Sequence, residues 1–202
     1  MTKAKHPPQV TPNGIVSATF QLIERKGWIH LSLLDIAQDL GITLADLHTL
    51  YPSKAEIMKA LIHSIEQKTL KHIDPAIAHY TEQERFFEVL MARFEVARAH
   101  KKAIGILYQE LSSNPTFLVD MVPLGLSSMT WLLEATGFHP TGILGFLQTK
   151  LFSILYLRLV YVWLKDETPD MAPTMAEVNK MTESFLPYIL HPKQLLNICG
   201  IL

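Results

Sequence analysis

The chain has 202 residues and a formal net charge of −1, with 49% hydrophobic and only 18% charged residues. This balance excludes a largely disordered chain, because disorder goes with low hydrophobicity and high net charge. It also excludes a protein that is basic overall, so nucleic-acid binding would need a local basic cluster. Helical periodicity runs through nearly the whole chain, and no stretch shows the sustained alternation that is typical of strands.

The first 54 residues predict a group of three helices. A helix at about 13–26 ends at Gly27, and two short helices at about 32–40 and 43–50 flank Gly41. Ser32 and Thr43 stand at N-cap positions, where a side-chain oxygen accepts from free backbone N–H groups. Pro52-Ser53-Lys54 then begins a long helix that runs to about residue 74.

Longer helices are predicted beyond residue 80, at about 81–99, 101–112, 115–136, 140–165 and 170–186, with Pro and Gly between them. The apolar run 143–164 has the length of a membrane span but contains Lys150 and Arg158. Each of these charges costs about 2.5–3.5 kcal/mol at the centre of a spanning helix. We therefore predict a helix buried partly in a core and partly in a dimer interface.

Two short helices around a glycine turn, between one helix and a longer one, form a helix-turn-helix pattern. The residues Gly27-Trp28, Ser32, Asp35-Ile36-Ala37, Gly41-Ile42-Thr43, Leu47 and Tyr51-Pro52-Ser53-Lys54 resemble the N-terminal domain of TetR/AcrR-type regulators. The resemblance implies a dimer formed by the last two long helices and a C-terminal pocket for an apolar small molecule. It places DNA contacts at seven positions: Ser32, Thr43, Asp46, His48, Thr49, Tyr51 and Lys54.

Other positions depart from that family. Leu31, Leu34, Leu44 and Leu50 stand where hydroxyl, basic or imidazole side chains are common, and no Lys or Arg occurs from residue 28 to 53. Duplex DNA binding depends largely on Lys and Arg displacing counterions from phosphate. The remaining cations near this region are Lys3, Lys5, Arg25, Lys26, Lys54 and Lys59, so we expect weak DNA binding.

A second resemblance points to another function. Gly27-Trp28, together with residues 165–171 (Lys-Asp-Glu-Thr-Pro-Asp-Met), is similar to the lipid-binding accessory proteins of ubiquinone biosynthesis. Those proteins share the TetR-type fold, do not read DNA, bind a lipid in the C-terminal pocket and touch the membrane through a C-terminal helix. The segment 186–202 is apolar but is interrupted by Pro187 and Pro192.

Catalysis and metal binding find no support in the motifs. Nine histidines are present, but no His-Glu-x-x-His pattern accompanies them, and the single cysteine, Cys199, excludes an internal disulfide and a cysteine-based zinc site. We find no nucleophile elbow, P-loop or Gly-x-Gly motif. We therefore expect neither an enzyme nor a cofactor or metal, and the lone cysteine favours a cytoplasmic protein.

Methionine and aromatic residues along the C-terminal helices are first of all core, and they also adapt well to irregular apolar ligands. The predicted pocket residues are Phe86, Met91, Phe94, Tyr108, Met129, Trp131, Leu132, Phe152 and Tyr156. Arg93 and Arg98 are the charges expected to meet a polar ligand group. The predicted dimer-interface residues are Leu151, Leu155, Arg158, Val162, Met181 and Phe185.

The sequence thus predicts an all-α protein with a three-helix helix-turn-helix head (residues 1–54) and a five- to six-helix ligand-binding and dimerisation body (55–202). The favoured function is a cytoplasmic, homodimeric, ligand-responsive transcriptional regulator with an atypical, acidic head. The alternative is a lipid-binding accessory protein that does not bind DNA and has peripheral membrane contact. The expected cavity has a volume of about 300–1,000 Å³.

Overall fold

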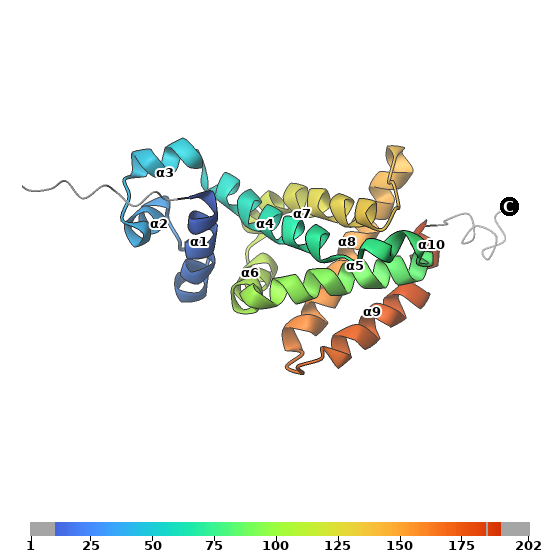
Figure 1. Cartoon of the computed structure of the whole chain (residues 1–202). Coiled ribbons are helices and arrows are strands. Elements are labelled where there is room, and N and C mark those ends of the chain that lie inside the picture. The colour runs from blue at the N-terminus through green and yellow to red at the C-terminus, as the bar shows by residue number, and fades with distance from the viewer. Residues whose placement is uncertain (1–10, 185, 191–202) are drawn as a thin grey trace, which may run out of the picture. The chain divides into compact units, whose positions relative to one another are not determined.

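The structure is a computed structural model in which residues 11–184 and 186–190 are described (Figure 1). Within these residues the chain is helical and has no strand, so the all-α prediction is confirmed. The helices are α1 (Pro12–Lys26), α2 (Leu33–Leu40), α3 (Leu44–Leu50), α4 (Lys54–His72), α5 (Glu82–Ala97), α6 (Lys101–Ser113), α7 (Pro115–Ala135), α8 (Gly142–Lys165), α9 (Ala172–Ser184) and α10 (Leu186–Leu190). Two 3-10 helices, η1 (Pro75–His79) and η2 (Arg98–His100), flank α5.

The chain divides into two compact units. The first consists of the described residues of Met1–Ser64 together with His100–Met121, and the second of Ile65–Ala99 with the described residues of Val122–Leu202. This division differs from the expected boundary between residues 54 and 55. Helices α4 and α7 each contribute to both units, and α6 belongs with the N-terminal helices because it packs against α1.

Hydrogen bonds between residues close in sequence set the limits of the three N-terminal helices. Ser32 and Thr43 cap α2 and α3 through reciprocal capping boxes with Asp35 and Asp46. The turn between them contains Gly41 in the left-handed conformation, with φ 65° and ψ 32°. This conformation costs a residue with a Cβ about 1–2 kcal/mol, which is why glycine suits the turn.

The core of the first unit is built from one apolar face of each N-terminal helix and of the first half of α4. Its fully or almost fully buried residues include Ile15, Phe20, Ile23, Leu31, Ile36, Leu47, Ile57 and Leu61. Phe20 also stacks on the His100 ring with the centroids 3.8 Å apart. Helix α1 contacts both α2 and α6, so the head packs around α1.

In the second unit, α9 lies alongside α5 and α8 (Figure 1). Aromatic rings fill the space between α5 and α8: Phe94 stacks on Tyr156 and Trp163, with centroid distances of 5.8 and 5.5 Å. Phe86 meets Phe152 edge to face at 6.0 Å. Such ring pairs contribute about 0.5–1.5 kcal/mol beyond their buried area, so this part of the body is a packed core.

Asp166 organises the junction between α8 and α9. Its carboxylate accepts hydrogen bonds from the backbone N–H and the hydroxyl of both Thr168 and Thr174, at 2.5–3.0 Å. Burial raises the pKa of Asp166, but these four bonds together outweigh burial and lower the pKa to about 2. The segment that resembles the lipid-binding accessory proteins therefore has a structural role in joining α8 to α9.

Among the described residues, two helices are long and apolar enough to cross a membrane by length and composition: Pro115–Ala135 and Gly142–Lys165. Helices buried in a protein core pass the same test. Lys150 and Arg158 lie within the second helix and are exposed. These two exposed charges weigh against a membrane span for α8.

Candidate functional site

The α2–turn–α3 unit presents most of α3 to solvent. Leu47 is the only residue of α3 that is buried, and it anchors the helix to the core. Thr43, Asp46, His48 and Thr49, which were predicted to contact DNA, are all exposed on or next to this helix. A short helix held by one buried leucine, with its polar side chains outward, has the form of a recognition helix.

Capping commits several of these polar groups to the protein itself. Asp46 accepts from both the hydroxyl (2.6 Å) and the N–H (3.0 Å) of Thr43, and these bonds lower the pKa of Asp46. Ser32 makes the same pair of bonds to Asp35. Thr49 donates to the carbonyl of Ala45 at 2.9 Å. Of the four predicted polar contacts on or next to α3, His48 is the one for which no side-chain hydrogen bond is described.

Tyr51 and Lys54, the last two predicted DNA contacts, are only partly accessible. Tyr51 ends α3 through a 2.8 Å bond from its N–H to the Leu47 carbonyl, and partial burial raises the pKa of its phenol. Lys54 donates to the carbonyl of Trp28, and its ammonium lies 4.5 Å from the centroid of the Trp28 ring. Burial lowers the pKa of Lys54. These contacts make Lys54 a brace within the head rather than a free phosphate ligand.

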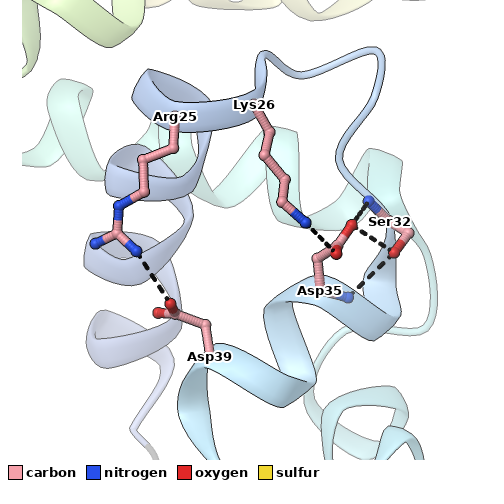
Figure 2. A network of polar contacts seen from close by, with 5 residues as sticks. All are labelled: Arg25, Lys26, Ser32, Asp35 and Asp39. Carbon is pink, nitrogen blue, oxygen red and sulfur yellow. Dashed lines mark hydrogen bonds and ion pairs between the residues drawn. The ribbon is translucent and has the colours of Figure 1, made fainter.

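Two further cations of the head are paired with its acidic residues. Arg25 of α1 lies 3.4 Å from Asp39, and Lys26 lies 2.5 Å from Asp35. Both carboxylates belong to α2, and Figure 2 shows the two contacts. The hydrogen bond from Lys26, followed by those from Ser32, holds the pKa of Asp35 well below its usual range. The pairs neutralise two of the three acidic residues between positions 28 and 53 and at the same time occupy two cations of the head.

The other cations counted for DNA binding are peripheral. Lys59 lies 3.9 Å from Glu56 on the same helix, an exposed pair of the kind that contributes little stability. Lys3 and Lys5 lie outside the described residues. The structure thus leaves fewer free cations at the head than the sequence alone indicates.

Three apolar side chains are exposed on the head at positions where hydroxyl, basic or imidazole side chains were expected from the family resemblance. Leu34, Leu44 and Leu50 are 49%, 47% and 41% exposed. Leu31, which the family resemblance placed among the DNA-facing positions, is only 2% exposed and belongs to the core. Leu31 therefore does not belong to the exposed face of the head, because its side chain packs inward ahead of the α2 cap.

Glu110 of α6 is a structural contact of the head that sequence reasoning missed. Its carboxylate accepts from the backbone N–H of Trp28 at 3.1 Å and of Ile29 at 3.3 Å. A Cβ on Gly27 would lie 2.4 Å from a Glu110 oxygen, so any larger residue there would displace this carboxylate. The contact joins positions 82 residues apart, and no local sequence pattern indicates it.

The predicted pocket residues differ in burial and belong to both units. Phe86, Phe94, Met129, Leu132 and Phe152 are buried in the second unit, Met91 and Tyr156 are half-buried, and Trp131 is 55% exposed. Tyr108 is half-buried in the first unit. Trp131 and Leu132 alone among them line a small hollow that also contains Glu66, Thr69, Leu70, Val89, Arg93 and Ala135.

Arg93 is the one buried cation described in the body. It is 7% exposed and donates from Nε to the Tyr156 hydroxyl at 2.9 Å and from Nη2 to the Ser128 hydroxyl at 2.8 Å. Its Nη1 is buried and has no hydrogen-bond partner among the described residues. Arg98, the other expected ligand contact, instead pairs with Glu95 at 3.6 Å and donates to the Pro169 carbonyl.

The hollow beside Arg93 has a volume of about 10 Å³, close to the space that one water molecule needs. A second hollow, a groove of about 180 Å³, lies between α8 and α9 and is lined by Leu155, Arg158, Leu159, Glu177, Lys180 and Met181. Neither has the volume expected for the ligand cavity.

The predicted dimer-interface residues differ in exposure. Leu151 is 52% exposed, and Arg158 is exposed and paired with Glu177 at 2.6 Å. Leu155 and Val162 are half-buried. Met181 is 4% exposed and packs inside its own chain, and Phe185 lies outside the described residues.

No protein-family model matches the chain, and no curated protein is similar to it in sequence. Solved structures are similar in fold. A TetR transcriptional regulator from Nitrosomonas europaea has a TM-score of 0.66 at 17% identity, with 85% of this chain and 95% of that chain covered. A TetR transcriptional regulator from Rhodococcus sp. RHA1 has a TM-score of 0.58 at 16% identity, covering 85% and 94%. The chain therefore has the TetR-type fold, as its helix-turn-helix residues predicted.

Proposed function

We propose that this protein is a cytoplasmic, homodimeric transcriptional regulator of the TetR type whose DNA binding is controlled by a small, mainly apolar ligand. The observation that carries the proposal is the capped α2–turn–α3 unit, with α3 anchored by Leu47 and its polar residues outward. A helix serving only to fill a core would bury more than one side chain. The similarity in fold to two TetR transcriptional regulators supports the same proposal.

The homodimer is supported by an unpartnered apolar face on α8. Ile143, Leu147, Leu151 and Ile154 expose 49–83% of their surface and follow helical spacing along one side of the helix. Soluble monomers rarely expose large contiguous apolar patches. A second copy of α8 would cover this face, and the low charged fraction of the chain fits such burial.

A lipid-binding accessory protein that does not read DNA is the second candidate. The observation that favours it is the state of the head: Leu34, Leu44 and Leu50 are exposed, while Lys26 and Lys54 are bound within the protein. With two or three phosphate contacts per subunit, log K of a dimer against log salt would have a slope of about −4 to −5. That is weak binding for a repressor.

Fluorescence anisotropy with the duplex upstream of the protein's own gene, at 50 and 200 mM salt, separates the two candidates. Sequence-selective binding that survives at 200 mM supports the regulator. A folded dimer that binds neither this duplex nor arbitrary duplex at 50 mM favours the accessory protein.

A charge added to α3 sharpens the same experiment. Leu44→Lys places a cation on the outward face of the recognition helix and should steepen the salt slope of the dimer by about 2, or 0.9 for each added contact. Val119→Lys adds the same charge at a position that is 69% exposed on α7, outside the head. If both variants change DNA affinity equally, α3 does not face the DNA.

A further inference from the structure

One donor of Arg93 is buried without a hydrogen-bond partner among the described residues. Tyr156 and Ser128 hold the guanidinium from two sides, and its Nη1 is left over. Burying a polar group without a partner is unfavourable, and more so when the group is charged. Native proteins seldom keep such a group, and where one is kept it is explained by strain, by a functional role or by a bound water or ion.

The space beside Arg93 admits one oxygen-sized group. The hollow has a volume of about 10 Å³, which matches a single water or a single hydroxyl or carbonyl oxygen. A carboxylate or phosphate, with two or more oxygens, is too large for it. The two residues of its lining that are most exposed are apolar, Leu70 at 46% and Trp131 at 55%.

The charges that line the hollow also select against an ion. Glu66 and Arg93 both line it, both are more than nine-tenths buried, and their formal charges cancel. A neutral guest keeps the lining neutral, whereas an anion or a cation brings a net charge into a buried site, which is strongly unfavourable.

We infer that this hollow binds the single-oxygen end, a hydroxyl or a carbonyl, of an uncharged and otherwise apolar molecule, with Arg93 Nη1 donating to that oxygen. The hydrocarbon part lies over Leu70 and Trp131, and its burial there supplies most of the affinity. The inference rests on the proposed ligand-binding role of the body and names the chemical class of the ligand. It assigns Arg93, rather than the exposed Arg98, as the residue that recognises it.

The first test compares eight-carbon probes on the full-length, unmodified protein by isothermal titration calorimetry at pH 7.5. Octan-2-one and octan-1-ol are neutral, and octanoate and octylammonium carry one charge of either sign on a chain of equal length. We expect the two neutral probes to bind at least ten-fold more tightly than either ion. Equal or tighter binding of octanoate overturns the inference, and so does failure of every probe to bind, which would mean that the hollow holds a water only.

Two variants with a matched control locate the site. Arg93→Met should lower the affinity for octan-2-one at least ten-fold, because the donor is lost, while Arg98→Met, at the C-cap of α5, should change it less than two-fold. Glu66→Gln should lower the ratio of the affinity for octan-2-one to that for octanoate at least ten-fold. The lining then carries a net positive charge, which favours the anion. Equal effects of Arg93→Met and Arg98→Met, or an unchanged preference in Glu66→Gln, contradict the inference.

Circular dichroism of each variant shows whether it is folded, and the comparison of probes on the unmodified protein needs no variant at all. Failure of this inference is distinguishable from failure of the proposed function. Ligand binding is measured without DNA, so a protein that prefers neutral probes but binds no duplex retains the inference and loses the regulator assignment. A protein that binds duplex but prefers octanoate does the reverse.

Discussion

Replacing Gly27 by alanine tests how the head is held. Gly27 has φ 76° and ψ 162°, a region of backbone conformation that is essentially restricted to glycine. Alanine would pay about 1–3 kcal/mol of strain there. Its Cβ would also lie 2.4 Å from a Glu110 oxygen, so the carboxylate would have to withdraw from the N–H groups of Trp28 and Ile29.

The second effect adds to the first. A hydrogen bond to a charged group contributes about 1.5–3 kcal/mol, and water replaces part of it once the carboxylate moves. We therefore expect Gly27→Ala to lower the free energy of unfolding by about 3–5 kcal/mol, a large share of the roughly 5–15 kcal/mol of a typical domain. The measurement is urea denaturation followed by circular dichroism at one fixed protomer concentration, since dimerisation makes stability depend on concentration.

Two other glycines serve as matched controls. Gly41 has φ 65° but no atom within 4 Å of an added Cβ, so Gly41→Ala should cost only the conformational strain, about 1–2 kcal/mol. Gly125 lies in α7 with open space around it, and Gly125→Ala should stabilise the protein by about 0.5–1 kcal/mol. The double variant Gly27→Ala with Glu110→Ala should lose less stability than the two single variants lose together, by about 1–2 kcal/mol. A cost for Gly27→Ala no greater than that for Gly41→Ala, or full additivity with Glu110→Ala, refutes the reasoning.

The remaining predictions concern the body. The pKa of Asp166 is about 2 in the folded protein, against 3.8 for an unperturbed aspartate. The carboxylate therefore stabilises the fold above pH 4, and this contribution is lost as the pH falls toward 2. Asp166→Asn should therefore lower the free energy of unfolding by about 2 kcal/mol at pH 7. Denaturation at a series of pH values should show that the variant's stability changes less between pH 4 and 2 than that of the unmodified protein. An equal change in both proteins would contradict this prediction. The double variant Leu151→Glu with Ile154→Glu should give a folded monomer in sedimentation experiments. The control Val119→Glu, which also replaces an exposed apolar side chain (69% exposed) by a charged one, should leave the dimer intact. An unmodified protein that sediments as a monomer at micromolar concentration rules out the α8 interface. Thr174→Val removes one of the hydroxyl donors to Asp166 from a fully buried site and should lower stability by about 1–2 kcal/mol, whereas Thr116→Val, the same change at an exposed position, should not.

The limits of the helices follow from short-range chemistry, which is why the sequence predicted them well. Ser32 and Thr43 each bond to the residue three positions later, and Gly41 adopts its left-handed turn without help from any distant atom. The all-α architecture and the helix-turn-helix unit were predicted for the same reason. Their hydrogen bonds join residues within about four positions of one another.

Exposure of individual side chains on those helices was harder to predict. Leu31, just before α2, and Leu34, on α2, are both leucines, yet the first is 2% exposed and the second 49%. The sequence also showed only in part how few cations of the head are available for DNA. The sum of charges from residue 28 to 53 says nothing about Arg25 and Lys26 reaching back to Asp39 and Asp35.

The sequence by itself determined where the helices begin and end, the glycine turn of the head and the apolar face of α8. Tertiary structure alone decided that Glu110 binds the N–H groups of Trp28 and Ile29, and that Arg93 meets Ser128 and Tyr156 across 35 and 63 positions. The physical reason is the range of the interactions. A cap or a turn is complete within a few residues, whereas the partner of a buried charge depends on which helix faces come together when the apolar surfaces pack.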